Sequence, residues 1–138
     1  MFKFGGILLL AAAAAGGFMY FQAPSAPESA LTSAQKQRMA IIDKCVDFGD
    51  RAIANDQAIV AFQMLERLSK KAGVIERCMA DNGYRTNPAW LKYAEPIAKT
   101  TAAQDKSSTD EALTTLRRAD MQVINPVKNR PDYWITNH

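Results

Sequence analysis

The fold is decided by the apolar pattern of the stretch Met39-Ala40-Ile41-Ile42-Asp43-Lys44-Cys45-Val46-Asp47-Phe48-Gly49-Asp50-Arg51-Ala52-Ile53. Its apolar side chains recur every three or four residues, which places them along one side of a helix. Thr32 and Gln35 precede the pattern with the spacing of a capping box, which satisfies free N–H groups at a helix start. We therefore expect a helix that starts just after Thr32 and ends at about Ala54.

The residues that follow predict a second helix and a short third one. Asn55 and Asp56 can cap a helix whose apolar pattern continues to about Lys71. Gly73 suits a helix end in the left-handed conformation, and residues 74–80 then form a short helix. The chain is thus expected to reverse twice, once at residues 55–56 and once at Gly73.

The remaining helix signals lie after residue 86. The Asn-Pro pair at 87–88 places a cap residue before a proline at the first helical position, and Pro96 is expected to interrupt that helix. Ser108 and Glu111 form a second capping box, which opens a helix to about Val123. No strand alternation is evident, so the predicted fold class is all-α.

The two cysteines, Cys45 and Cys78, predict a disulfide in a small domain outside the cytoplasm. With both reversals in place, Cys45 and Cys78 are expected at nearly the same position along the axes of the packed helices, where their thiols can meet. One straight helix from residue 34 to Lys71 would instead separate them by roughly 35 Å. Disulfide and double reversal are therefore predicted together, and the bond is expected to contribute about 3 to 4 kcal/mol to stability. Two buried free thiols or an interchain bond are the alternatives.

The amino-terminal residues 1–23 predict a transmembrane helix. An uncharged run at 5–21 follows a single Lys3 and covers roughly 25 Å as a helix, close to the thickness of a bilayer core. Cleavage by signal peptidase after Ala23 or Ala26 would place Pro24 or Pro27 directly after the cut, which disfavours both sites. We therefore predict an uncleaved signal anchor, with a cleaved signal peptide as the alternative.

The positive-inside rule gives this anchor an orientation. The amino terminus is expected in the cytoplasm, with a single pass through a bacterial inner membrane. A linker at 24–31, a helical domain at 32–124 and an extended aromatic tail at 125–138 then lie in the periplasm.

Small residues in the anchor predict helix packing inside the membrane. Ala12 with Gly16, and Ala13 with Gly17, are small residues four apart, a spacing that allows another helix to approach closely. The segment is therefore expected to dock onto a larger membrane protein complex or onto its own copy. An ordinary alanine-rich signal region is the alternative.

Two further surface features are candidates for binding. The aromatic cluster Tyr133, Trp134 and Ile135 of the tail is a possible docking element. A basic cluster could attract membrane lipid headgroups or be a solvated helix face. It consists of Arg67, Lys70, Lys71 and Arg77.

Catalytic chemistry is not supported by the sequence. The only histidine is His138, so a Ser-His-Asp or Cys-His system lacks a base, and two cysteines with His138 do not make a zinc site. Asp43, Asp47 and Asp50 share one helical face, but an Asp47–Arg51 ion pair is the simpler reading. We predict no enzyme activity, no cofactor, no metal and no small-molecule substrate. A net charge of +3 is too small to indicate a nucleic-acid-binding surface.

The leading functional hypothesis is a non-enzymatic accessory or scaffold subunit of a bacterial inner-membrane protein complex. Residues 78–84, Cys-Met-Ala-Asp-Asn-Gly-Tyr, resemble a Cys-Met-x-x-x-Gly-Tyr segment of many small bacterial envelope proteins. This resemblance implies a location in the bacterial envelope and no particular activity. The alternatives are a periplasmic binding module for peptidoglycan, lipid headgroups or a client protein, and a phage or prophage lysis or injection protein.

Overall fold

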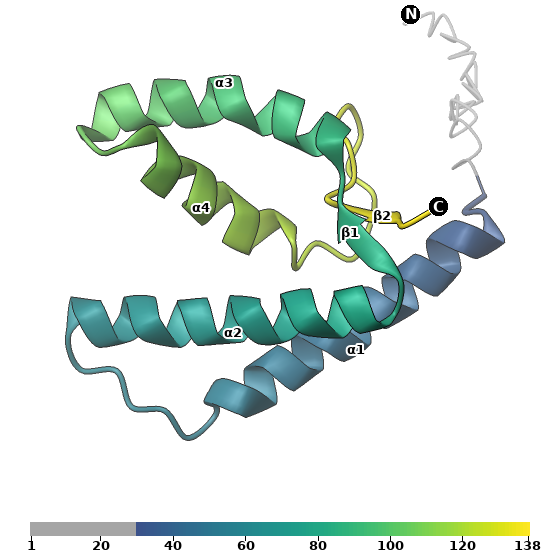
Figure 1. Ribbon diagram of the computed structural model, residues 1–138, viewed down its shortest axis with the longest axis horizontal. Coiled ribbons are helices and arrows are strands. Elements are labelled where there is room, and N and C mark those ends of the chain that lie inside the picture. Colours follow the sequence, from purple (N-terminus) through teal and green to yellow (C-terminus); the bar gives the residue numbers. More distant parts are fainter. Residues whose placement is uncertain (1–29) are drawn as a thin grey trace, which may run out of the picture. The chain divides into compact units, whose positions relative to one another are not determined.

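The computed structural model describes residues 30–138, and residues 31–138 form one compact unit. The predicted anchor at 1–23, with Ala12, Ala13, Gly16 and Gly17, and nearly all of the linker lie outside the described residues. Within residues 30–138, no helix combines the length and apolarity needed to cross a membrane. The elements in chain order are α1 (Ser33–Ile53), α2 (Ala61–Asp81), β1 (Tyr84–Thr86), α3 (Pro88–Asp105), α4 (Thr109–Asp120) and β2 (Trp134–Thr136) (Figure 1).

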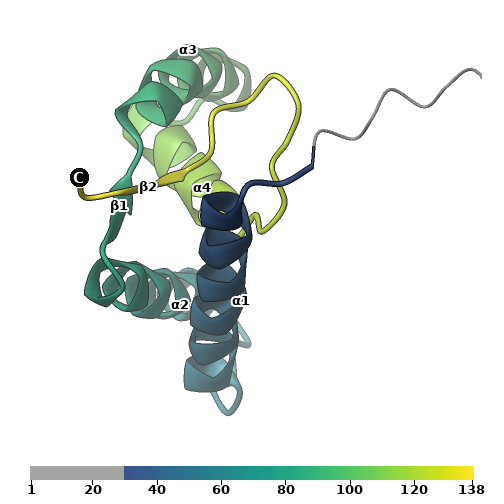
Figure 2. The same cartoon turned by 90° about the vertical axis from the view of Figure 1, so that its right-hand side faces the viewer.

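The unit is mostly helical and consists of two helical hairpins joined by a short strand pair. Helix α1 packs on α2, and α3 packs on α4. Strands β1 and β2 pair antiparallel, with Tyr84 opposite Thr136 and Thr86 opposite Trp134 (Figure 2). The all-α prediction therefore missed a two-stranded sheet. Strands of three residues are too short to show an alternating pattern, and the partners lie about fifty residues apart in the chain.

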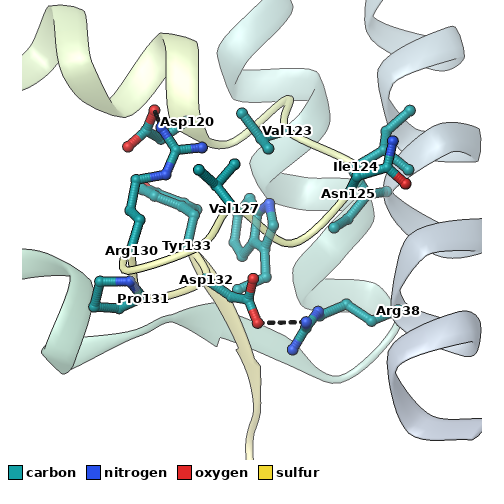
Figure 3. Close-up of a pocket in the computed structure, with 12 residues that line it drawn as sticks. Arg38, Asp120, Val123, Ile124, Asn125, Val127, Arg130, Pro131, Asp132 and Tyr133 are labelled. Atoms are coloured by element: carbon teal, nitrogen blue, oxygen red, sulfur yellow. Dashed lines mark hydrogen bonds and ion pairs between the residues drawn. The ribbon is translucent and has the colours of Figure 1, made fainter. Parts of the chain in front are cut away.

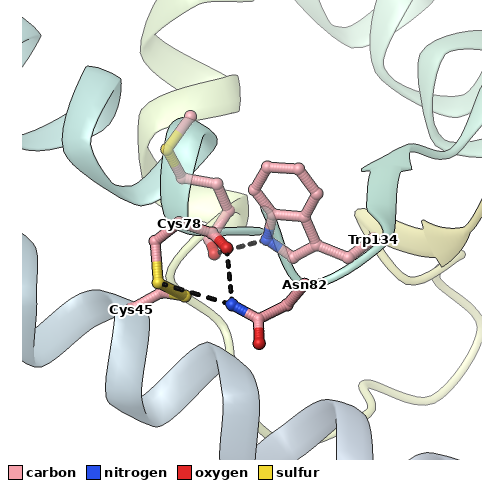
Figure 4. Close-up of a disulfide and its surroundings, with 5 residues drawn as sticks. Cys45, Cys78, Asn82 and Trp134 are labelled. Carbon is pink, nitrogen blue, oxygen red and sulfur yellow. Dashed lines mark hydrogen bonds between the residues drawn. A yellow bond between two sulfur atoms is a disulfide. The ribbon is translucent and has the colours of Figure 1, made fainter. Parts of the chain in front are cut away.

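Helix α1 and the disulfide match the prediction. The Thr32 hydroxyl accepts a hydrogen bond from the Gln35 N–H at 3.1 Å, and Gln35 Oε1 accepts one from the Thr32 N–H at 2.8 Å. Cys45 and Cys78 form an intrachain disulfide with Cα atoms 5.6 Å apart, and the Asn82 amide donates to the Cys78 carbonyl at 2.7 Å (Figure 4).

Helix α2 is continuous, so the predicted second reversal is wrong. Gly73 lies inside the helix, whereas Gly83, with φ of +82°, takes the left-handed conformation after the helix end. Asn55 and Asp56 do not cap α2. The helix starts at Ala61, where the Gln63 side chain accepts hydrogen bonds from the Ile59 and Val60 N–H groups at 2.9 and 3.3 Å.

A single reversal still allows the disulfide because the connection between the helices is long. Cys45 lies eight residues before the end of α1, or about 12 Å, and Cys78 lies 17 residues after the start of α2, or about 25 Å. Residues 54–60 cover the difference of about 13 Å. The disulfide thus fixes a register in which the first turns of α2 extend beyond the end of α1.

Helix α3 also continues past its predicted interruption. The Asn87 side chain accepts a hydrogen bond from the Ala89 N–H at 2.9 Å, which confirms the cap, and Pro96 lies inside the helix. A proline removes one backbone hydrogen bond, but packing can outweigh that loss. Ala98 and Ala102, both beyond Pro96, are buried against Ala112 of α4.

Helix α4 begins where predicted, with the Ser108 half of the predicted capping box, and ends earlier than predicted. The Ser108 hydroxyl accepts a hydrogen bond from the Glu111 N–H at 3.1 Å. The helix ends at Asp120 instead of about Val123, because residues 121–124 turn away to start the tail.

The tail at 125–138 is anchored in the core by two aromatic side chains, while residues 125–129 and 136–138 are exposed. Tyr133 and Trp134 are buried, and the Tyr133 ring contacts Trp90 with centroids 4.6 Å apart. The Trp134 indole N–H donates to the Met121 carbonyl at 2.9 Å. Tyr133 and Trp134 therefore hold the domain together, and only the half-buried Ile135 of the predicted docking cluster retains exposed side-chain surface.

Charged side chains hold this tail in place. Arg38 of α1 pairs with Asp132, and Arg130 pairs with Asp120 at 3.0 Å, around a cavity of only about 10 Å³ (Figure 3). Asp120 also accepts from the Trp90 indole N–H at 2.7 Å. A hydrogen bond to the Tyr133 hydroxyl raises the pKa of Arg117 above its ordinary value.

Gly73 supplies a stability prediction. A Cβ at this position would meet nothing within 4 Å. Glycine inside a helix costs about 0.5 to 1 kcal/mol relative to alanine, so Gly73→Ala should raise the free energy of unfolding by that amount. Urea denaturation followed by circular dichroism measures the change. A lower stability for Gly73→Ala would contradict the continuous α2.

Candidate functional site

The most unusual surface lies at the start of α2, where large apolar side chains are exposed. Ile59 is 85% exposed, Phe62 67% and Leu65 51%. We call this set the α2 overhang, and it comprises Ile59, Val60, Phe62, Met64, Leu65 and Leu68. Scattered single apolar residues are normal on a surface, but a continuous group of this kind marks an interaction site.

The overhang continues the face of α2 that forms the core. Leu68 and Ile75 are seven residues apart, and Ile75 and Met79 four apart, so the three lie on one side of the helix. Ile75 and Met79 are fully buried, whereas Leu68 is 39% exposed. The apolar stripe therefore runs past the edge of the core, because the disulfide register carries the start of α2 beyond α1.

A groove separates the overhang from α4. Its volume is about 290 Å³, and Leu65 supplies its apolar side. The α4 side is polar and consists of Asp110, Glu111, Thr114, Thr115 and Arg118. Arg118 closes one end, because its Nη2 donates to the Ser69 hydroxyl of α2 at 2.7 Å. The groove thus offers one apolar wall and one wall of hydroxyls and carboxylates.

The predicted basic cluster does not form one cationic surface. Lys71 pairs with Asp50 of α1 at 2.5 Å, and Lys70 pairs with Asp56 at 2.9 Å. Arg67 is half-buried, and its Nε has no hydrogen-bond partner. Two of the four cations are therefore neutralised by neighbouring carboxylates.

Two of the three carboxylates on the acidic face of α1 are likewise engaged in ion pairs. Asp47 pairs with Arg51 at 2.7 Å, as predicted, and Asp50 pairs with Lys71. Across the part of the chain that the structure describes, no cluster of His, Cys, Asp and Glu side chains is arranged to hold a metal ion.

Sequence reasoning placed residues 59–68 in a helix but did not identify them as a surface. One signal was present in the sequence. Apolar residues occupy seven of the ten positions from Ile59 to Leu68, which is more than one buried helix face can use. Comparisons with protein-family models, with curated proteins and with solved structures find no match to this chain.

Proposed function

We propose that this chain is a non-enzymatic accessory or scaffold subunit of a bacterial inner-membrane complex, and that its α2 overhang docks a helix of a partner subunit. The observation that carries the proposal is the uncovered apolar stripe of α2, which a folded domain exposes at a cost unless something covers it. The predicted anchor at 1–23 gives the proposal its membrane setting.

The groove beside the overhang defines the chemistry of the partner. An amphipathic helix in a groove presents apolar anchors on one side and polar groups on the other. Its anchors would pack on Leu65 and Leu68, and its polar edge would face α4. Asp110 and Glu111 are exposed at the start of α4, so lysine or arginine on that edge is complementary in charge.

A site-specific photocrosslinker tests this docking in the full chain in its native membrane. Benzoylphenylalanine at Phe62 or Leu65 is expected to capture one membrane-complex subunit, and the crosslinked peptide should be an amphipathic helix with a cationic edge. The matched control is the same group at Val127, an apolar residue that is also exposed and lies in the tail. It should not capture that peptide.

A charge substitution completes the test. Leu65→Asp should abolish the crosslink from Phe62, while the stability of the domain changes by less than about 0.5 kcal/mol because Leu65 is half exposed. Val127→Asp should leave the crosslink intact. Crosslinking to a second copy of this chain, or to the same peptides from all three positions, would refute docking of a partner helix.

A further inference from the structure

A second groove lies between α1 and α2, and Cys78 of the disulfide is one of its lining residues. Its volume is about 540 Å³, within the range of small-molecule sites. Phe48 of α1 and Val74 and Cys78 of α2 supply apolar surface. Gly73 adds no side chain, and a Cβ there would meet nothing within 4 Å, so the glycine leaves the groove open.

The rim of this groove carries an excess of positive charge. Lys44, Lys70 and Arg77 line it, together with the carboxylate of Asp81. Lys70 is paired with Asp56. Within residues 30–138, neither Lys44 nor Arg77 has a carboxylate at ion-pair distance, and the Lys44 Nζ lies 5.6 Å from the centre of the Phe48 ring.

The disulfide explains why these two cations lie beside the same groove. Lys44 immediately precedes Cys45, and Arg77 immediately precedes Cys78. The helices run antiparallel, since Asp50 of α1 reaches back to Lys71 of α2. On two antiparallel helices, the residues before a pair of crosslinked positions turn to the same side of the contact. The covalent bond therefore fixes both charges on one side.

We propose that this groove binds an anionic amphiphile that has one acyl chain and an acidic head. The chain would lie on Phe48, Val74 and the open surface at Gly73. The head would lie between Lys44 and Arg77, whose charges lack a partner within the described residues. This site is separate from the α2 overhang and does not depend on the docking proposed there.

The test uses the full chain in phosphatidylcholine nanodiscs and two photoreactive probes of equal chain length. A photoreactive dodecanoate should label peptides that contain Phe48 and Val74, whereas the matching dodecyl-trimethylammonium probe should not. Each well-placed cation changes the binding of an anionic head by about fivefold, so K44Q/R77Q should lower dodecanoate labelling about 25-fold. K99Q/K128Q, which removes two other exposed cations, should leave it unchanged.

A second pair of variants tests the groove without changing its charge. Gly73→Leu fills the open space and should abolish labelling, while Gly73→Ala should retain it, and both should keep the helical content of the native chain. Equal labelling by the two probes, or labelling that survives K44Q/R77Q or Gly73→Leu, would overturn the proposal. Labels found on the Phe62 and Leu65 peptide would move the site to the overhang and overturn it as well.

Discussion

Trp134→Ala is expected to lower the free energy of unfolding by about 3 to 5 kcal/mol, the range found when a large buried side chain is truncated. Trp134 is buried in the core, where its indole N–H donates to the Met121 carbonyl and its ring packs edge-on against Tyr133 at 4.7 Å. The substitution therefore creates a cavity and leaves the Met121 carbonyl without that donor. Because domains of this size are stable by only about 5 to 15 kcal/mol, the loss should be large in a urea titration.

Phe62→Ala is the matched control for this prediction. It also removes an aromatic side chain, but from a position that is two-thirds exposed, so the expected change is within about 0.5 kcal/mol. The stability measurement distinguishes a core-packing role of Trp134 from a docking role. If Trp134→Ala left stability unchanged and only weakened binding to a partner, Trp134 would be a docking residue and its place in the core would be wrong.

Removal of the disulfide is the second change with a large expected effect. Cys45→Ala with Cys78→Ala opens a loop with a sequence separation of 33 residues. The chain-entropy model gives about 3 to 4 kcal/mol for a loop of this size, since the unfolded chain regains conformations that the crosslink forbids. Thermal or urea unfolding of the double variant beside the native protein measures the loss.

Reduction of the native protein gives an independent check on this value. Dithiothreitol should lower its stability to nearly that of the double alanine variant, and reduction should not affect the variant itself. A difference below about 1 kcal/mol between oxidised and reduced native protein would mean that the bond adds little to the packing of α1 on α2.

Three of the four described helix starts could be predicted from the sequence because their signals are local, whereas α2 starts at Ala61 instead of after Asn55 and Asp56. Thr32 with Gln35, Asn87 with Pro88, and Ser108 each act on N–H groups within three residues, and all three caps are present. Local signals were less reliable for helix ends. Gly73 and Pro96 are both inside helices, because burial of residues beyond them stabilises the helix more than one unfavourable residue destabilises it.

Long-range features could be predicted only in part. The pairing of Cys45 with Cys78 was correct, although the predicted chain path was not. The prediction assumed that α2 follows α1 directly, without a connecting segment that takes up length along the helix axes. The seven residues from 54 to 60 supply that length. The exposure of the α2 overhang follows from the same offset between the two helices. The apolar density of residues 59–68 signals more apolar surface than one helix face can bury, but it does not encode the offset that leaves this surface uncovered.

The length of α1 also sets a spacing for whatever binds at the overhang. Residue 31 lies at one end of this 21-residue helix, and the overhang begins past its other end. A helix of that length is a rod of about 30 Å. In an anchored chain, a partner at the overhang would thus be engaged at least that far from where the domain joins its linker. The domain would then act as a rigid spacer, and the insertion or removal of whole turns of α1 before Cys45 would change the distance between linker and overhang in steps of about 5 Å.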